Sequence, residues 1–171
     1  MKMFGSKSLS TFLYYGCTVI TVASLSLISF ILFSLALENF ELINEQFKIT
    51  IPLFPEMAIK GRYNDITITT ITLFFIFYTI FFGLLTMIFK TFKASILFTD
   101  KAIKQLNYFT FLNLLVAPIL YITINFIILV KDNYYDFASF LLHILLGIMA
   151  LFIVAVFKKG YTIQSENDLT I

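Results

Sequence analysis

Charged residues are scarce in this sequence, cysteine and histidine occur once each, and tryptophan is absent. Charged residues make up 13% of the 171 residues and hydrophobic residues 60%, whereas soluble domains have about 25% charged and about 45–50% apolar residues. Because so few charges cannot cover so much apolar surface in water, the composition excludes an ordinary soluble domain and favours a lipid environment. Cys17 and His143 alone exclude an intramolecular disulfide and a Cys/His zinc site, which needs about four ligands.

Four long stretches contain no Asp, Glu, Lys or Arg: residues 8–37, 66–89, 105–130 and 137–157. Each exceeds the roughly 20 residues that a helix needs to cross about 30 Å of hydrocarbon, and a helix satisfies its backbone polar groups internally. We therefore predict an all-α membrane protein, a single four-helix domain over residues 1–171 with up-down-up-down topology. The predicted parts are spans at about 10–37, 66–89, 105–130 and 137–157, an outer loop at 38–65, an inner link at 90–104 and a tail at 158–171.

Lysine and arginine are distributed unevenly between the two sides of such a bundle. One side carries Lys2, Lys7, Lys90, Lys93, Lys101, Lys104, Lys158 and Lys159, whereas the other carries only Lys48, Lys60, Arg62 and Lys131. Basic residues concentrate on the cytoplasmic side of membrane proteins. The pattern predicts a multi-pass protein of the cytoplasmic (inner) membrane with both termini in the cytoplasm. It also accounts for these lysines without direct binding of nucleic acid.

The outer loop has the pattern of a small extracytoplasmic hairpin. Apolar and polar residues alternate over residues 47–51, which predicts a short strand. Pro52 and Pro55 are expected to end this strand, and Lys60-Gly61 is expected to form a turn. Because an isolated two-stranded hairpin is only marginally stable, we expect it to pack as a flap on the outer ends of the helices.

Two polar side chains stand out inside the predicted spans. His143 lies about 9 Å below the start of the fourth span, and Asn125 lies about 8 Å below the end of the third, at about 1.5 Å per residue. These matching depths predict an interhelical hydrogen bond between Asn125 and His143. A ligand-sensing or pH-sensing histidine is the functional alternative. Asn113 is expected to make a further packing contact, and Pro118 is expected to bend the third span.

The residues inside the spans offer little for catalysis. No carboxylate, lysine or arginine lies in the four stretches, although pumps and proton-coupled carriers usually keep such a group at mid-membrane. Catalysis would need His143 to pair with a serine of the first span, and helix serines commonly bond their own backbone instead. No phosphate loop or zinc-ligand spacing is present. We therefore expect no catalytic residue, no metal site and no cofactor.

The tail combines acidic and apolar residues after a glycine. Gly160 is expected to end the fourth helix. Glu166 and Asp168, interleaved with Leu169 and Ile171, then form a segment that is too short to fold alone. Such a segment could dock in a basic groove or add a strand to a sheet edge, and the alternative is a frayed terminus.

Two segments carry a family resemblance. They are Leu97-Phe98-Thr99-Asp100-Lys101-Ala102-Ile103-Lys104-Gln105-Leu106 at the end of the inner link and Ile163-Gln164-Ser165-Glu166-Asn167-Asp168-Leu169-Thr170-Ile171 in the tail. With four spans and one large outer loop, they resemble the bacterial membrane family catalogued as domain of unknown function 2975. That resemblance implies no enzymatic activity. Members are often encoded beside a very small helix-turn-helix regulator, which implies a cytoplasmic partner of that kind.

The leading hypothesis is therefore a non-enzymatic membrane anchor or sensor that binds a small helix-turn-helix regulator. The residues expected to bind this partner are Lys101 and Lys104 in the inner link and Gln164, Glu166, Asp168, Leu169 and Ile171 in the tail. The alternative is a small transport or channel subunit that acts as a homo-oligomer. An intramembrane enzyme that uses His143 is the least favoured hypothesis.

Overall fold

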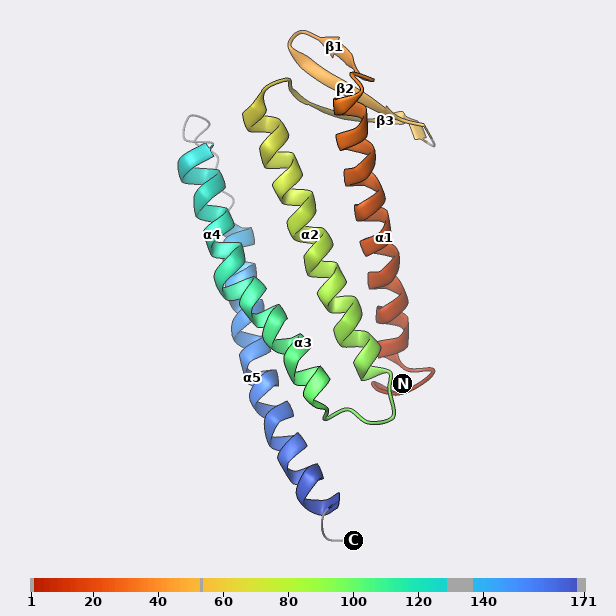
Figure 1. The fold of residues 1–171 in the computed structure, drawn as a ribbon, viewed down its shortest axis with the longest axis vertical. Helices are drawn as coiled ribbons and strands as arrows, with labels where there is room; N and C mark the ends of the chain where they lie inside the picture. Colours follow the sequence, from red (N-terminus) through yellow and green to blue (C-terminus); the bar gives the residue numbers. More distant parts are fainter. Residues whose placement is uncertain (1, 53, 129–136, 169–171) are drawn as a thin grey trace. The chain divides into compact units, whose positions relative to one another are not determined.

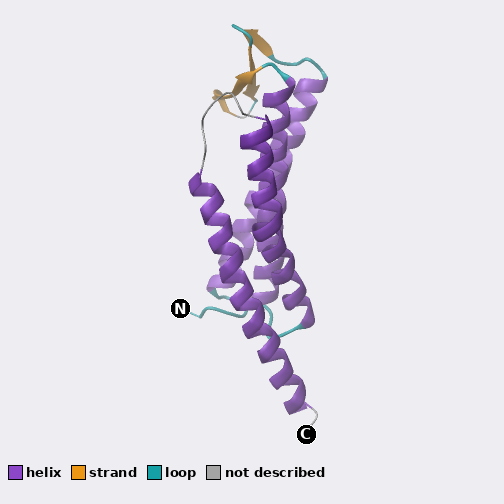
Figure 2. Ribbon diagram, turned by 90° about the vertical axis from the view of Figure 1, so that its left-hand side faces the viewer, coloured by secondary structure: helices purple, strands orange, loops and turns teal. Residues whose placement is uncertain are grey.

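The computed structural model describes residues 2–52, 54–128 and 137–168. The chain forms two compact units, of which one is Ile20–Ile80 and the other combines Met1–Val19 with Phe81–Ile171. Helices dominate both units, and the strands all belong to the segment between the first two long helices (Figure 2).

Four helices are long and apolar enough to cross a membrane: Leu9–Ala36, Asp65–Phe92, Asp100–Phe126 and Phe137–Asn167. The first two are α1 (Leu9–Ala36) and α2 (Asp65–Phe92). The third is a helical run of α3 (Asp100–Phe111), η1 (Leu112–Val116), α4 (Ala117–Ile122) and η2 (Thr123–Ile128), and the fourth is α5 (Phe137–Asp168) (Figure 1). The prediction of four span-length apolar helices is confirmed, while their up-down-up-down order in a membrane stays a prediction.

The third helical run begins earlier than its charge-free stretch. The Thr99 hydroxyl caps α3 by accepting a hydrogen bond from the backbone N–H of Ala102 at 3.2 Å. Asp100 follows in the first turn, where a negative charge is favoured by the helix dipole. The end of the predicted inner link is thus helical from Asp100 onward. The Thr99 cap and the charge of Asp100 stabilise this first turn, although it lies outside the charge-free stretch.

Pro118 follows the π-helical segment η1, with Ala117 between them. The backbone N–H of Ala117 bonds the carbonyl of Leu112, five residues earlier, at the end of η1. Proline has no N–H to donate and its ring crowds the carbonyl of the preceding turn. A wider turn before Pro118 accommodates this defect without ending the helical run.

The segment between α1 and α2 forms a three-stranded antiparallel sheet in the order β1 (Glu41–Ile43), β2 (Gln46–Ile51) and β3 (Phe54–Arg62). The predicted strand at 47–51 is confirmed. Asn44 and Glu45, with φ of 51° and 63°, form the two-residue turn between β1 and β2. Positive φ at both turn residues matches the right-handed twist of the flanking strands.

Two details of the predicted hairpin are wrong. Lys60 and Gly61 do not form a turn but pair with Lys48 and Phe47 inside β3. Pro55 lies within β3 rather than ending a strand. β3 is an edge strand, and an edge strand tolerates glycine and proline because one side of its backbone has no strand partner. The role of the sheet as a flap over the outer helix ends stays a prediction.

One face of the sheet is held by the core of its own unit. Phe47 and Ile49 of β2 are almost completely buried against Ile31 of α1. Partly buried apolar residues complete this cluster, namely Leu27, Phe30, Leu35, Phe40, Ile59, Ile68, Ile71 and Phe75. The sheet is therefore stabilised by apolar packing against the helices that flank it in the sequence.

The fourth helix does not end at Gly160, so that prediction is wrong. α5 continues to Asp168. A Cβ atom at position 160 would lie 2.6 Å from the ring of Phe98, which precedes α3. Gly160 therefore allows close approach of a neighbouring segment. This packing outweighs the roughly 1 kcal/mol by which glycine disfavours a helix interior.

Candidate functional site

Of the tail residues expected to bind a partner, Gln164, Glu166 and Asp168 lie on a helical extension of α5. Glu166 is exposed, and Gln164 is half-buried on the same side of the helix as Gly160. The adjacent side presents Ile163, which is 50% exposed, between Lys159 and Glu166. Residues spaced by three and four positions share one helix face. The side chain of Asp168 and the whole of Leu169 and Ile171 lie outside the described residues.

The two lysines of the inner link lie in the first turns of α3. Lys101 and Lys104 are both exposed, and the ammonium group of Lys104 lies 2.7 Å from the carboxylate of Asp100, one turn earlier. Both side chains of this ion pair are more than half exposed, so the pair adds little to stability. Within residues 2–52, 54–128 and 137–168, neither lysine forms an ion pair with the tail.

Aromatic packing fixes the inner link to α5. The ring of Phe157 stacks on Phe92 at a centroid distance of 5.4 Å and meets Phe98 edge-on at 5.2 Å. Phe98 in turn packs on Gly160. The end of α2, the start of α3 and the middle of α5 therefore share one contact. From this contact α5 extends past the start of α3 (Figure 1).

The N-terminal segment closes the end of α2, which the sequence analysis did not foresee. The carbonyl of Phe92 accepts hydrogen bonds from the N–H of Gly5 at 3.2 Å and the hydroxyl of Ser10 at 3.3 Å. The ammonium group of Lys93 lies 4.3 Å from the ring centre of Tyr14. The last carbonyls of a helix need partners, and the polar residues around the start of α1 were the available signal.

The buried histidine pairs with an asparagine other than the predicted one. His143 Nδ1 lies 2.7 Å from Asn113 Oδ1. Asn113 Nδ2 donates to the carbonyl of Phe109 at 2.8 Å, which orients the amide oxygen toward His143. Because an amide oxygen only accepts, the proton of this bond belongs to His143 Nδ1. Asn125 instead donates to the carbonyl of Tyr121 in its own helix at 2.9 Å. The predicted pairing of Asn125 with His143 is therefore wrong.

The wrong pairing arose from the assumption that the end of the third span and the start of the fourth lie at the same depth. One antiparallel register places Phe98 beside Gly160 and Leu114 beside Gly147. Asn125 is about 18 Å farther along the run than Asn113, at about 1.5 Å per residue, and so lies far from His143 in this register. Counting inward from the ends of the two charge-free stretches therefore does not give the register between the helices.

Two pairs of hydrogen-bonded polar side chains lie at separate places in this unit. Thr91 and Gln105 share a hydrogen bond of 2.6 Å near the inner link. The Asn113–His143 pair lies elsewhere in the same unit, with the ring of Phe81 edge-on to the imidazole at a centroid distance of 5.6 Å. In the described residues these groups are bonded within the protein and do not form a continuous polar path.

Comparison with known proteins gives no relative from which a function could be transferred. The chain matches no family model, and no curated protein or solved structure matches it.

Proposed function

We propose that this chain is a non-enzymatic, multi-pass membrane protein that anchors a small cytoplasmic regulator through the inner link and the helical extension of α5. In this proposal the four long helices span the cytoplasmic membrane, and both termini lie in the cytoplasm. The lysine distribution supports that orientation. The resemblance of the inner link and tail to the family named above supports a helix-turn-helix partner.

One observation carries the proposal. α5 continues to Asp168, beyond the charge-free stretch that ends at residue 157, and most of its residues from Lys158 to Asn167 are exposed. A helix that presents an apolar residue between charged ones is suited to docking in a groove of a partner. Ile163, flanked by Lys159 and Glu166, provides such a face. The helical form also favours groove docking over addition of a strand to a partner sheet.

The aromatic contact around Phe157 gives this face a defined neighbour. Phe98 packs against Phe157 and Gly160 of α5, and α3, which carries the exposed Lys101 and Lys104, begins shortly after Phe98. A partner could then contact acidic and basic groups at once. Such paired charges provide specificity and raise the rate of association.

The test is a pull-down from native membranes in mild detergent, followed by mass spectrometry. The full chain is compared with a chain that lacks residues 161–171 and with Glu166→Lys. The control is Glu56→Lys, which makes the same charge change in the exposed β3 strand. We expect a small helix-turn-helix protein that is retained by the control and lost in the other two. Equal recovery with all four chains would contradict the proposal.

The transport alternative has less support. It requires a polar path through the protein or through an oligomer, whereas the buried polar groups described above are paired and separated. A flux measurement in vesicles that contain the purified chain distinguishes the two hypotheses. Passage of ions or small solutes that is lost on Asn113→Leu would favour transport.

A further inference from the structure

Two lysines lie directly opposite each other in the sheet. Lys48 of β2 is the cross-strand neighbour of Lys60 of β3, and Glu41 of β1 is the neighbour of Lys48 on its other side. Directly opposite residues share one face of an antiparallel sheet, and like charges in this position are destabilising. The face that carries this row, opposite to the buried face of Phe47 and Ile49, thus has an unfavourable charge arrangement.

The acidic residue of the row neutralises only one of the two cations. The ammonium group of Lys48 lies 3.0 Å from the carboxylate of Glu41. Lys60 is exposed and forms no ion pair with any residue that the structure describes. An anion placed beside both lysines would remove the repulsion that the sheet alone leaves.

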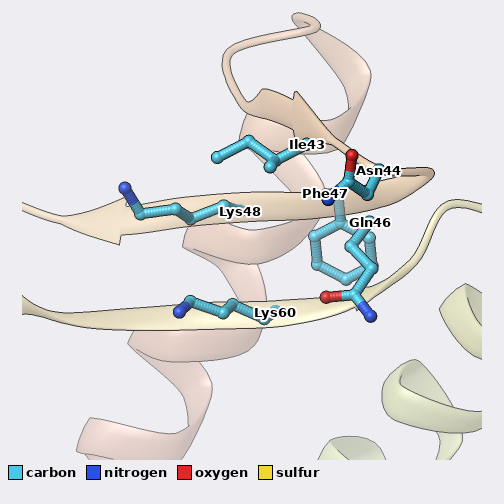
Figure 3. Close-up of a pocket in the computed structure, with 6 residues that line it drawn as sticks. All are labelled: Ile43, Asn44, Gln46, Phe47, Lys48 and Lys60. Atoms are coloured by element: carbon cyan, nitrogen blue, oxygen red, sulfur yellow. The ribbon is translucent and has the colours of Figure 1, made fainter.

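A cavity of about 180 Å³ lies against these lysines and is lined by Ile43, Asn44, Gln46, Phe47, Lys48 and Lys60. The two lysine side chains extend in the same direction along the strands, and the amides of Asn44 and Gln46 lie toward the hairpin turn (Figure 3). The cavity thus has a cationic end and an end with neutral groups that both donate and accept hydrogen bonds.

We propose that this cavity binds a phosphate ester of a small polyol, of the glycerol phosphate class. The phosphate lies at the ammonium groups of Lys48 and Lys60, because lysine binds phosphate as a point charge. The hydroxyl groups reach the amides of Asn44 and Gln46, and the carbon chain packs on Ile43. The layout of charged, amide and apolar groups distinguishes this ligand from a bare anion.

The same chemical group occurs in two sources, as soluble glycerol phosphate and as the headgroup of phosphatidylglycerol. The chemistry of recognition is shared, so the probes must separate the sources. The probes are sn-glycerol 3-phosphate, inorganic phosphate and short-chain phosphatidylglycerol, each added to the full-length protein in a phosphate-free maltoside detergent.

Binding is measured as a rise in Tm, because a ligand that binds only the folded state stabilises it. Unfolding is followed with a fluorogenic thiol reagent, since Cys17 is the only cysteine and is buried. Sodium chloride at equal ionic strength gives the baseline. We expect glycerol 3-phosphate to raise Tm more than inorganic phosphate does. An effect of phosphatidylglycerol alone, dependent on Lys60, would instead assign the lipid as the source.

Four variants make the test specific. Lys60→Gln should weaken binding by about tenfold or more, as loss of a charge-assisted bond predicts, and Lys2→Gln, the same change at an exposed lysine outside the sheet, should not. Glu41→Gln should tighten binding because it releases Lys48. Gln46→Ala should abolish the preference for glycerol 3-phosphate over phosphate. An absence of any Tm rise, or an equal rise in Lys60→Gln, would overturn the proposal.

Discussion

His143 Nδ1 lies 2.7 Å from Asn113 Oδ1, in a buried contact between the third and fourth long helical runs. Asn113 has no exposed surface and His143 is 6% exposed. The amide of Asn113 is fixed at its other end by the carbonyl of Phe109. This pair therefore specifies which faces of α5 and η1 meet, because another register would separate His143 Nδ1 from Asn113 Oδ1 and remove the hydrogen bond between them.

Loss of either member of this pair should destabilise the protein. We expect His143→Ala and Asn113→Ala each to lower the free energy of unfolding by about 1–2 kcal/mol, in line with hydrogen bonds between membrane helices. Thermal unfolding in detergent, read by labelling of Cys17, measures the change. Asn125→Ala is the control, because Asn125 bonds only its own helix in the described structure.

A double-mutant cycle tests whether the two side chains act together. The effects of His143→Ala and Asn113→Ala should be less than additive, since the second substitution removes a group that has already lost its partner. Strict additivity, or an equal loss in Asn125→Ala, would contradict a specific His143–Asn113 bond.

The contact between Gly160 and Phe98 should be sensitive to one added methyl group. Gly160→Ala would place Cβ 2.6 Å from the Phe98 ring, and overpacking of this kind costs about 1–3 kcal/mol. In a Phe98→Ala background the same substitution should become neutral or stabilising, because alanine is favoured over glycine in a helix by about 1 kcal/mol. Thermal unfolding of the four chains checks this reversal of sign, and the same sign in both backgrounds would refute the contact.

Two other glycines offer a matched comparison. A Cβ atom at Gly147 would lie 2.5 Å from Leu114, whereas one at Gly16 would meet nothing within 4 Å. We expect Gly147→Ala to lower Tm and Gly16→Ala to leave it unchanged or raise it slightly. If the two substitutions have equal effects on unfolding, helix propensity rather than packing controls both positions.

The proposed orientation predicts which positions a membrane-impermeant thiol reagent can reach. In a Cys17→Ser background, Thr50→Cys in the exposed part of β2 should be labelled from outside intact cells. Lys159→Cys, on the exposed face of α5, should be labelled only after the membrane is opened. Labelling with the reverse preference would invert the topology and would move the proposed partner site out of the cytoplasm.

The periodicity of charge and of apolar residues was sufficient for the main elements. Charge-free stretches located four span-length helices, because a helix that crosses lipid needs about 20 apolar residues whatever its neighbours are. Alternation over residues 47–51 located β2 for a similar local reason. It was harder to predict which segments pack against each other. Glycine at position 160 has the local propensity of a helix end, and only the ring of Phe98 packed against it explains why α5 continues.

In the candidate interface, too, local patterns predicted some features and tertiary packing decided others. Composition placed the exposed charges of Lys101, Lys104 and Glu166 near the ends of helices, because charges avoid hydrocarbon. The sequence could not reveal that the tail is a helix with Ile163 on its exposed side, since that depends on how far α5 continues. The row of Glu41, Lys48 and Lys60 likewise required the register of three strands.

The amino-acid sequence by itself determined the apolar character of this protein, the number of its long helices and the β2 strand of its sheet, since these follow from transfer of side chains between water and lipid and from local periodicity. The tertiary structure alone decided that His143 meets Asn113, that Phe98 packs on Gly160 and that Lys60 faces Lys48. These relationships depend on the register between segments, and register is set by the packing of many side chains at once rather than by any local pattern.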